Sequence, residues 1–397
     1  MARQARQSAR ARWPQVRGRT GGRVSCGGFR IDTLENKDYG MFLSAKTPLV
    51  AIDIGSHSIK VAQLAGVRDK YELLSFGLMP LESEAIVDGV VKKEDVVIDT
   101  LSRLVKAEKI PTRHAAVSVA GEAVIVKKIK VPMMSEKELV LSINHEAEQY
   151  IPFDIDDVSI DFQIIGRGVA AEPEEESDQE KMEILLVAVQ RELIDSRTGI
   201  LAEAGLKPVI VDLDMFAIVN ALGVSRDLSR LGSVALLDLG ATFTHVNIVL
   251  NGFTAFTRDI PVGGSSCTQK LMSEFGVSYE QAEAIKRGEL PEKVEREDAV
   301  RVLAGSFGKI AEEVQKSFEF FSATTNTQVE RVFVSGGGAL VPGAAGLLGE
   351  KLGAPAELLD PFAAVKIGKK FDREMASRMA PIAAVAIGLA TRKFDYK

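Results

Sequence analysis

Short hydrophobic runs rich in β-branched residues open the folded part of the chain, and the first three follow one another closely. The first run spans 49–54, contains Asp53 and ends at a Gly-Ser turn. Two further runs follow at 59–65 and 71–79. Apolar runs of this length, bounded by turn residues, are typical of strands. The pattern therefore predicts a meander of three strands with a tight turn after the first.

The same order of elements returns later in the chain. A second apolar run at 234–239 contains Asp238 and ends at a Gly-Ala pair, and strand-like runs follow at 244–250 and 253–260. An Asn-Gly pair joins the last two runs, which is a strong hairpin signal. Because 185 residues separate Asp53 from Asp238, the sequence predicts a duplicated meander.

Segments with apolar residues at helical spacing occupy much of the remaining chain. They span 92–108, 135–151, 191–204 and 280–286. The second segment begins with Ser135 and Glu138, which match a capping box, and Pro152 ends it. Helices alternating with strands predict an α/β protein.

A smaller unit is predicted inside the first half. Strand-like runs at 115–120, 123–131 and 158–165 surround the capped helix, and an acid-rich loop is expected at 168–181. We therefore predict an inserted α+β subdomain over residues 115–181.

Charge is distributed unevenly along the chain. Residues 1–40 contain eight Arg and one Lys against three acidic residues. The whole chain has a net charge of −6, so the residues after 40 carry −12. An acidic body argues against nucleic-acid binding. The head is rich in Arg and Gly and is expected to be a disordered basic extension over 1–47. It either contacts anionic lipid or nucleic acid, or it precedes a true start at Met41; the closeness of Met41 to the first strand favours the second interpretation.

Two other classes of feature are excluded. No apolar run is long enough to cross a bilayer, and the basic head lacks the apolar core of a secretory signal. The cysteines, Cys26 and Cys267, share no motif spacing, so neither a disulfide framework nor a zinc site is predicted.

The turn after the first strand has the composition of a phosphate-binding loop. Gly55 lets the backbone turn tightly, and the hydroxyl groups of Ser56 and Ser58 supply further donors. Lys60 lies on the returning strand, where it can neutralise phosphate charge. Asp53 suits a metal ion held through water, because Mg²⁺ gives up its hydration shell reluctantly.

The second meander repeats this arrangement with Asp238, Gly240, Ala241 and Thr242. Two such turns facing each other would hold the β- and γ-phosphates, with the metal ion between Asp53 and Asp238. A single turn of this kind is more often a plain hairpin, but its presence at the same place in both meanders favours a nucleotide site.

Two further stretches suit the nucleoside. Gly336, Gly337 and Gly338 follow an apolar strand and carry no side chains, so a flat adenosine can lie against their backbone; the alternative is a plain strand-to-helix turn. Glu283 and Lys286 share one face of a predicted helix and can hold ribose hydroxyls and adenine edges, although such a pair is often only a solvated helix face. We also assign Gly263 and Gly264 to the nucleotide-binding set.

These motifs resemble those of the actin superfamily. Residues 53–60 are similar to its first phosphate loop, 238–242 to its second and 335–343 to its adenosine loop. Glu283 and Lys286 match an acid and a lysine on its adenosine-side helix. The resemblance implies two duplicated ribonuclease-H-like domains that bind ATP and Mg²⁺ between them.

The resemblance also extends to the helices that connect the two halves. Segments 212–222 and 379–391 are similar to the superfamily's connecting helices, and the first of these is where the family places a residue that orients the attacking water. Asp214 lies nearest that position and Asp212 is the other candidate; a structural role for Asp214 as a helix cap is the alternative. No arginine finger occupies a recognisable position, so we expect at most slow ATP hydrolysis.

Within the superfamily the chain resembles the PilM family of type IV pilus assembly proteins. Residues 146–154, 161–163, 128–132 and 186–190 are similar to that family's small inserted domain. Met41-Phe42 resembles its usual start. The resemblance implies a cytoplasmic protein of the inner-membrane assembly platform, peripheral to the membrane through protein partners, that supports pilus biogenesis and twitching motility.

The implied partner is the cytoplasmic N-terminal tail of a PilN-like bitopic inner-membrane protein. An extended peptide would lie in a groove between the inserted subdomain and the nucleotide-binding body. The alternative is that the insertion only stabilises the fold.

The resemblance fixes the expected domain limits. The first actin-like domain spans 48–114 and 182–222, interrupted by the subdomain at 115–181. The second spans 223–397 and contains a helical adenosine-side subdomain at about 261–330.

Two alternative functions share this fold. An FtsA-like cell-division actin would have the inserted domain, but such proteins attach to membrane through a C-terminal amphipathic helix, and the chain ends at Lys397, six residues after Thr391. A small-molecule kinase would need an acceptor pocket and a catalytic base, for which the sequence has no signature. Fold alone cannot separate these functions.

Overall fold

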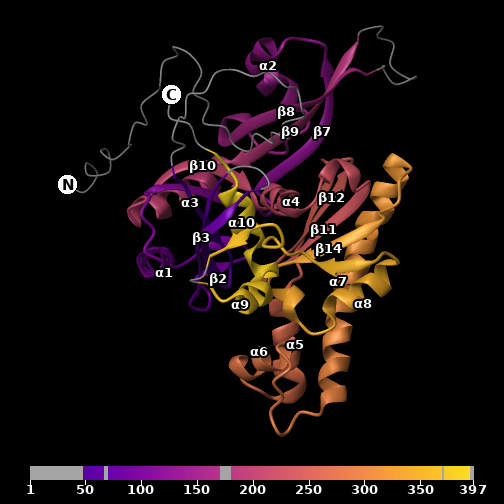
Figure 1. Ribbon diagram of the computed structural model, residues 1–397. Helices are drawn as coiled ribbons and strands as arrows, with labels where there is room; N and C mark the ends of the chain where they lie inside the picture. Colours follow the sequence, from indigo (N-terminus) through magenta and orange to yellow (C-terminus); the bar gives the residue numbers. More distant parts are fainter. Residues whose placement is uncertain (1–47, 67–69, 170–179, 369–370, 394–397) are drawn as a thin grey trace, which may run out of the picture.

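Two β-sheets with the same internal order form the centre of the chain (Figure 1). The structure is a computed structural model that describes residues 48–66, 70–169, 180–368 and 371–393. The basic extension at 1–47 and most of the acid-rich segment expected at 168–181 lie outside these residues.

The first sheet has six strands in the order β10-β6-β1-β2-β3-β16. These are β1 (Val50–Ile54), β2 (Ser58–Ala65), β3 (Glu72–Pro80), β6 (His114–Val119), β10 (Lys207–Leu213) and β16 (Lys366–Ile367). The strands β1 to β3 are antiparallel, whereas β6 and β10 run parallel to β1. Because β1 lies between two neighbours, every one of its residues is buried, which explains why all of them except Asp53 are apolar.

The second sheet has the order β13-β12-β11-β14-β15. Read from β15 to β13, this order matches β10-β6-β1-β2-β3 of the first sheet. Its strands are β11 (Ser233–Leu239), β12 (Thr244–Leu250), β13 (Phe253–Ile260), β14 (Arg331–Ser335) and β15 (Ala356–Leu358). The predicted duplication is confirmed in register as well as order: Asp53 pairs with Lys60 across β1 and β2, and Asp238 pairs with His245 across β11 and β12.

Two helices pack together where the halves meet. They are α4 (Asp214–Ser225), which leaves the first sheet, and α10 (Ala384–Ala390), near the end of the described chain. Both helices are almost entirely apolar and buried, and they share a core with strands of both sheets. Gly388 of α10 lies directly against the backbone of Ala217 in α4, so no side chain fits there.

Other helices cover the outer faces of the sheets. On the first sheet these are α1 (Glu94–Ala107) and α3 (Arg191–Glu203), and on the second they are the C-terminal half of α7 (Arg296–Thr325) and α8 (Ala344–Leu352). The helices α5 (Gly264–Phe275) and α6 (Tyr279–Lys286) pack with the start of α7 as a small helical unit. The short elements are β4 (Ile86–Val87), β5 (Val90–Val91), α9 (Arg373–Met379) and the 3₁₀ turns Leu228–Arg230, Gly337–Leu340 and Pro381–Ala383.

The inserted subdomain is a three-stranded sheet backed by one helix, at the opposite end of the molecule from α5 and α6 (Figure 1). Its elements are β7 (Val124–Pro132), α2 (Glu136–Glu148), the 3₁₀ turn Ile155–Asp157, β8 (Val158–Val169) and β9 (Lys181–Gln190). Leu139, Ile143 and Ala147 of α2 cover the sheet. The predicted capping box at Ser135 and Glu138 is present.

The expected limits of this subdomain, 115–181, need correction at both ends. The run at 115–120 belongs to β6, which pairs with β1 and β10 in the main sheet. The strand β9 pairs with β7 and β8 as far as Gln190, so the subdomain sheet spans 124–190. Local pattern showed these strands, but only long-range pairing assigns each one to a sheet.

The expected extent of the second domain, 223–397, also needs correction. Near the C-terminal end, β16 pairs with β3 and α10 packs on β1 and β2, so this part of the chain completes the first half. Within the described residues, no helix is both long and apolar enough to cross a membrane.

Candidate functional site

One cleft collects residues from both halves of the chain. It has a free volume of about 350 Å³, within the range of ordinary ligand pockets. Its walls include sixteen of the seventeen residues assigned from sequence to the nucleotide, the metal ion or catalysis: Asp53, Gly55, Ser56, Ser58, Lys60, Asp214, Asp238, Gly240, Ala241, Thr242, Gly264, Glu283, Lys286, Gly336, Gly337 and Gly338. The remaining residue, Gly263, does not line it.

The first loop follows the buried end of β1. The backbone N–H of Gly55 donates to the Ser58 carbonyl at 3.2 Å and closes the tight turn. Lys60 on β2 places its Nζ 3.2 Å from Asp53 Oδ2. The loop therefore presents one buried carboxylate and one cation at the end of the sheet.

The second loop is held by its neighbours. The N–H of Gly240 donates to the Phe243 carbonyl at 2.9 Å. The N–H groups of Gly264 and Ser265, at the start of α5, donate to the carbonyls of Gly240 and Ala241. Ser335 Oγ donates to Asp238 Oδ1 at 3.0 Å, which fixes the carboxylate against β14.

Gly263 supports this loop from behind. A Cβ atom at Gly263 would lie 2.6 Å from the Ala241 carbonyl oxygen, so the glycine is required for close packing. Gly263 does not line the cleft, and its assignment to the nucleotide-binding set stays a prediction.

The glycines after β14 pack in the same way. Gly336 adopts φ +85°, and a Cβ atom there would lie 2.6 Å from Asp238 Oδ1 and from the Leu239 carbonyl oxygen. Gly337, by contrast, has open space where a Cβ would be. The glycines thus both fit the turn against the second loop and leave bare backbone on the cleft wall.

Glu283 and Lys286 form a compact cluster with the start of α5. Lys286 Nζ donates to Glu283 Oε1 at 2.9 Å, to Thr268 Oγ1 at 3.0 Å and to the Gly264 carbonyl at 3.2 Å. Burial alone would raise the pKa of the Glu283 carboxyl, but hydrogen bonds from Thr268 and Lys286 outweigh burial and lower it. The pair is therefore tied to the start of α5 and is not free on a helix surface.

The structure decides between the two candidate acids at the start of α4. Asp214 lines the cleft and is the first residue of α4, one position after the N-cap residue Leu213, so the cap interpretation is wrong. Asp212 is fully buried, and its Oδ2 accepts a hydrogen bond from Arg392 Nε at 2.5 Å. Asp212 therefore links β10 to the C-terminal segment, and only Asp214 is placed to meet a ligand.

Three carboxylates share this cleft. Burial raises the pKa values of Asp53, Asp214 and Asp238, and charge repulsion among these acids raises the pKa values further. The positive charges of Lys60 and His245 act in the opposite direction and lower them. A divalent cation between Asp53 and Asp238 would relieve the repulsion, so the donor set fits Mg²⁺. Among the described residues, no three His, Cys, Asp or Glu side chains form a direct metal-binding group. A metal here would complete its coordination with water or phosphate oxygens, as Mg²⁺ usually does.

His245 lies across the strand pair from Asp238 and was not singled out from the sequence. Its Nδ1 is 2.6 Å from Asp259 Oδ1, and Asp259 Oδ2 accepts a hydrogen bond from the N–H of Gly121 at 2.9 Å. Burial would lower the pKa of His245, but Asp259 first, and then Asp238 and Asp214, raise it to about 9. The histidine is therefore a cation at neutral pH, and Asp259 joins it to the segment between β6 and β7.

The raised pKa of His245 predicts that the stability of the metal-free and nucleotide-free protein depends on pH. Its folded pKa of about 9 exceeds the ordinary value of 6.5. The stabilisation is therefore complete below about pH 6.5 and lost as pH rises through about 9, with a full magnitude of about 3 kcal/mol. Urea unfolding of wild type and His245→Gln between pH 6 and 9.5 should show the two stabilities converging as pH rises, whereas the exposed His145→Gln should run parallel to wild type. Equal slopes for His245→Gln and wild type would contradict this assignment.

Other lining residues also escaped the sequence analysis. Arg197 comes from α3, and His57 and Tyr279 approach each other from opposite halves, with Tyr279 Oη 3.4 Å from His57 Nδ1. Ser118 lies at the end of β6. Only His57, inside the first loop, lay in a recognised motif; the others stand in segments whose local pattern indicates nothing but a helix or strand.

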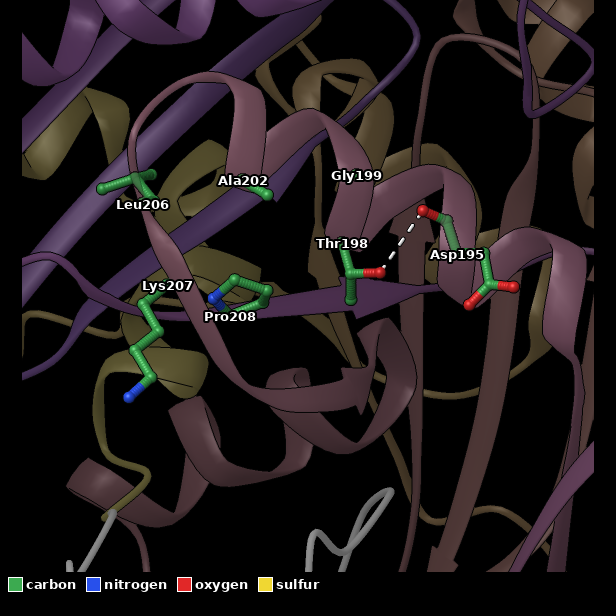
Figure 2. A pocket seen from close by; sticks show the side chains of 7 residues that line it. All are labelled: Asp195, Thr198, Gly199, Ala202, Leu206, Lys207 and Pro208. Carbon is green, nitrogen blue, oxygen red and sulfur yellow. Dashed lines mark hydrogen bonds between the residues drawn. The ribbon is translucent and has the colours of Figure 1, made fainter. Parts of the chain in front are cut away.

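A second hollow of about 350 Å³ lies apart from the cleft, between α3 and the start of β10. Figure 2 shows its seven lining residues, which are Asp195, Thr198, Gly199, Ala202, Leu206, Lys207 and Pro208. Thr198 Oγ1 donates within the helix to the Asp195 carbonyl at 3.3 Å. A Cβ atom at Gly199 would meet nothing within 4 Å, so this wall of the hollow is open.

Comparison with known proteins places this geometry in a family. The family model described as type IV pilus assembly protein PilM matches residues 51–394. Among curated proteins, the cell division protein FtsA of Bacillus subtilis (strain 168) is 26% identical over 259 residues, which cover 60% of this chain. The chain spans 57% of the length of FtsA, so that relationship is partial.

Two solved structures extend the comparison. The PilM-PilN type IV pilus biogenesis complex aligns with a TM-score of 0.75 and 25% identity, covering 87% of this chain and 98% of that one. The ethanolamine utilization protein EutJ from Carboxydothermus hydrogenoformans aligns with a TM-score of 0.51 and 17% identity, covering 86% and 88%, and shares the fold alone. The expected actin-like α/β fold is confirmed.

Proposed function

The chain belongs to the family of the type IV pilus assembly protein PilM, and from this premise we propose that it is the ATP-binding actin-like component of a type IV pilus inner-membrane assembly platform. In this role it acts in the cytoplasm, is held at the inner membrane by a protein partner, and supports pilus biogenesis and twitching motility. The observation that carries the nucleotide part of the proposal is the convergence of both duplicated loops on one cleft.

The family match favours this role over the two alternatives. The PilM family model matches residues 51–394, which include nearly all of the described residues, whereas the match to FtsA covers 60% of the chain. An FtsA-like cell-division role therefore has only this partial sequence match in its favour. No finding favours a small-molecule kinase.

Different residues of the cleft would contact different parts of ATP. The N–H groups and hydroxyls of the two loops would face the phosphates, and Lys60 and His245 would add positive charge. Mg²⁺, when bound, would supply further positive charge to neutralise the phosphates. Asp53 and Asp238 would hold its water ligands, and Asp214, which lines the cleft, would orient a water at the terminal phosphate.

Glu283, Lys286 and the glycines after β14 border the same cleft on the side of the second half. The bare backbone at Gly337 leaves room for a flat adenosine. Because Lys286 and Glu283 bond to each other and to Thr268, they would present a fixed pair of polar groups to the ribose.

The proposed partner is the cytoplasmic N-terminal tail of a PilN-like bitopic inner-membrane protein. A neighbouring fold was solved as a PilM-PilN complex, which supports a partner of this kind. In the described sheet β10 has a strand neighbour on one side only, and Val209, Ile210 and Val211 along it are half-exposed. An extended peptide could add to such an edge through backbone hydrogen bonds, with apolar anchors in adjacent pockets.

The hollow in Figure 2 offers one such anchor site beside β10. Gly199→Trp should fill it from α3 and weaken binding of a synthetic partner tail by at least about tenfold, or 1.4 kcal/mol, as measured by fluorescence anisotropy. ATP binding should be unchanged, because Gly199 does not line the nucleotide cleft.

Gly199→Ala is the matched control, since its methyl group meets nothing within 4 Å and leaves the hollow open. Equal peptide affinity for the tryptophan and alanine variants would rule out docking at this hollow. Binding of the protein to bare liposomes, without any partner peptide, would contradict recruitment through a protein.

A further inference from the structure

Arg197 brings a guanidinium to the nucleotide cleft from α3. The side chain is 6% exposed and lines the cleft together with Asp53, Asp214 and Gly89. Its Nη2 donates to the Gly89 carbonyl at 3.0 Å. Its Nη1 is buried and has no hydrogen-bond partner. One face of the guanidinium is thus anchored, and the other has an unused donor.

An unused buried donor of this kind is costly, because buried polar groups in folded proteins nearly always find a partner. Burial lowers the pKa of Arg197, and the charges of Asp214 and Asp53 act in the opposite direction. These two acids are therefore close enough to sense the guanidinium. Since arginine remains charged in proteins, the cleft contains a cation whose donors are only partly used.

The anchor of Arg197 lies next to the second phosphate loop. Gly89 adopts φ +78°, and a Cβ atom there would lie 3.8 Å from the ring of Phe243, the residue that follows Thr242. Gly89, in the first half, thus holds Arg197 close to the phosphate loop of the second half. Arginine in such a position suits phosphate, because its planar fork matches two phosphate oxygens.

On this basis, and resting on the proposed nucleotide site, we propose that Arg197 binds the terminal phosphate of a nucleoside triphosphate and makes the cleft prefer ATP to ADP. The unpartnered Nη1 would donate to an oxygen of the third phosphate, near Asp53 and Asp214. The anchored Nη2 keeps the group in place before the nucleotide arrives.

A purely structural role is the competing explanation. As a counter-ion for Asp53 and Asp214, Arg197 would stabilise the empty cleft, and its loss would weaken ATP and ADP equally. The ratio of the two affinities therefore separates a phosphate ligand from a structural counter-ion.

The test measures binding of the magnesium complexes of ADP and of a non-hydrolysable ATP analogue by isothermal titration calorimetry. Arg197→Gln should weaken the triphosphate by at least about tenfold, because a hydrogen bond to a charged group is worth at least that factor. Binding of ADP should change by less than about threefold. Arg197→Lys, which keeps the charge and most of the stem, should recover part of the preference and serves if the glutamine variant fails to fold.

Arg191→Gln is the matched control, since Arg191 is exposed at the first position of the same helix. Selective loss of the triphosphate supports the proposal. Equal weakening of both nucleotides, or none, overturns it while leaving the proposed nucleotide site intact. Failure of wild type to bind either nucleotide would overturn both.

Discussion

Asp53→Ala and Asp238→Ala are each expected to remove magnesium-dependent ATP binding. Both carboxylates lie at the ends of central strands, and both line the cleft. Without either acid, the metal loses one of the two groups that hold its water ligands. Affinity should fall by about 10- to 100-fold, the usual cost of removing a group that holds a metal ligand in place.

The readout is the difference between ATP affinities measured with Mg²⁺ and with a chelator. Wild type should show a large difference, and both variants should show almost none. The exposed Asp99→Asn on α1 is a control for the removal of one negative charge. If either alanine variant kept the affinity and magnesium dependence of wild type, the two-carboxylate arrangement would be wrong.

Gly388→Ala is expected to destabilise the whole fold. A Cβ atom at Gly388 would collide with the carbonyl of Ala217, where α10 crosses α4. Backbone atoms cannot rotate away as a flexible side chain can, so the two helices would have to separate within the core that joins both halves. Overpacking of this kind costs about 3 kcal/mol, which urea unfolding would measure as a lower midpoint.

Gly308→Ala provides the comparison for this substitution. Gly308 lies within α7, and a Cβ atom there meets nothing within 4 Å. Alanine should stabilise that helix by about 0.5–1 kcal/mol, because glycine is the poorer helix former. A Gly388→Ala protein with the unfolding midpoint of wild type would show that the helix crossing tolerates a side chain.

The duplicated meanders and their turns could be predicted because their signal is local. A buried central strand such as β1 favours a short run of mostly apolar residues, and the tight turn after it favours glycine, so both features can be recognised from neighbouring residues. The same is true of the α2 capping box, whose two residues lie three positions apart. Resemblance to the actin superfamily then indicated which of these turns share a ligand.

Which strands join which sheet could not be predicted in this way. The run that became β6 has the composition of any buried strand, and its neighbours β1 and β10 lie far away in sequence. Similarly, the short β16 carries no signal of its own and is a strand only because β3 offers it an edge. Pairing partners of this kind are chosen by the packing of the whole domain, so the domain limits at 115, 181 and 397 required correction.

The residues of the candidate site also fall into two groups, those that a local motif predicts and those that only the tertiary structure places. The sequence by itself determined the groups that stand in motifs, such as Asp53, Lys60 and Asp238, because a phosphate loop needs them at fixed short spacing. Only the tertiary structure separated Asp214 from Asp212 and placed Gly263 behind its loop. It alone brought Arg197 to the cleft, because the anchor at Gly89 lies 108 positions away and no local pattern records a contact across that distance.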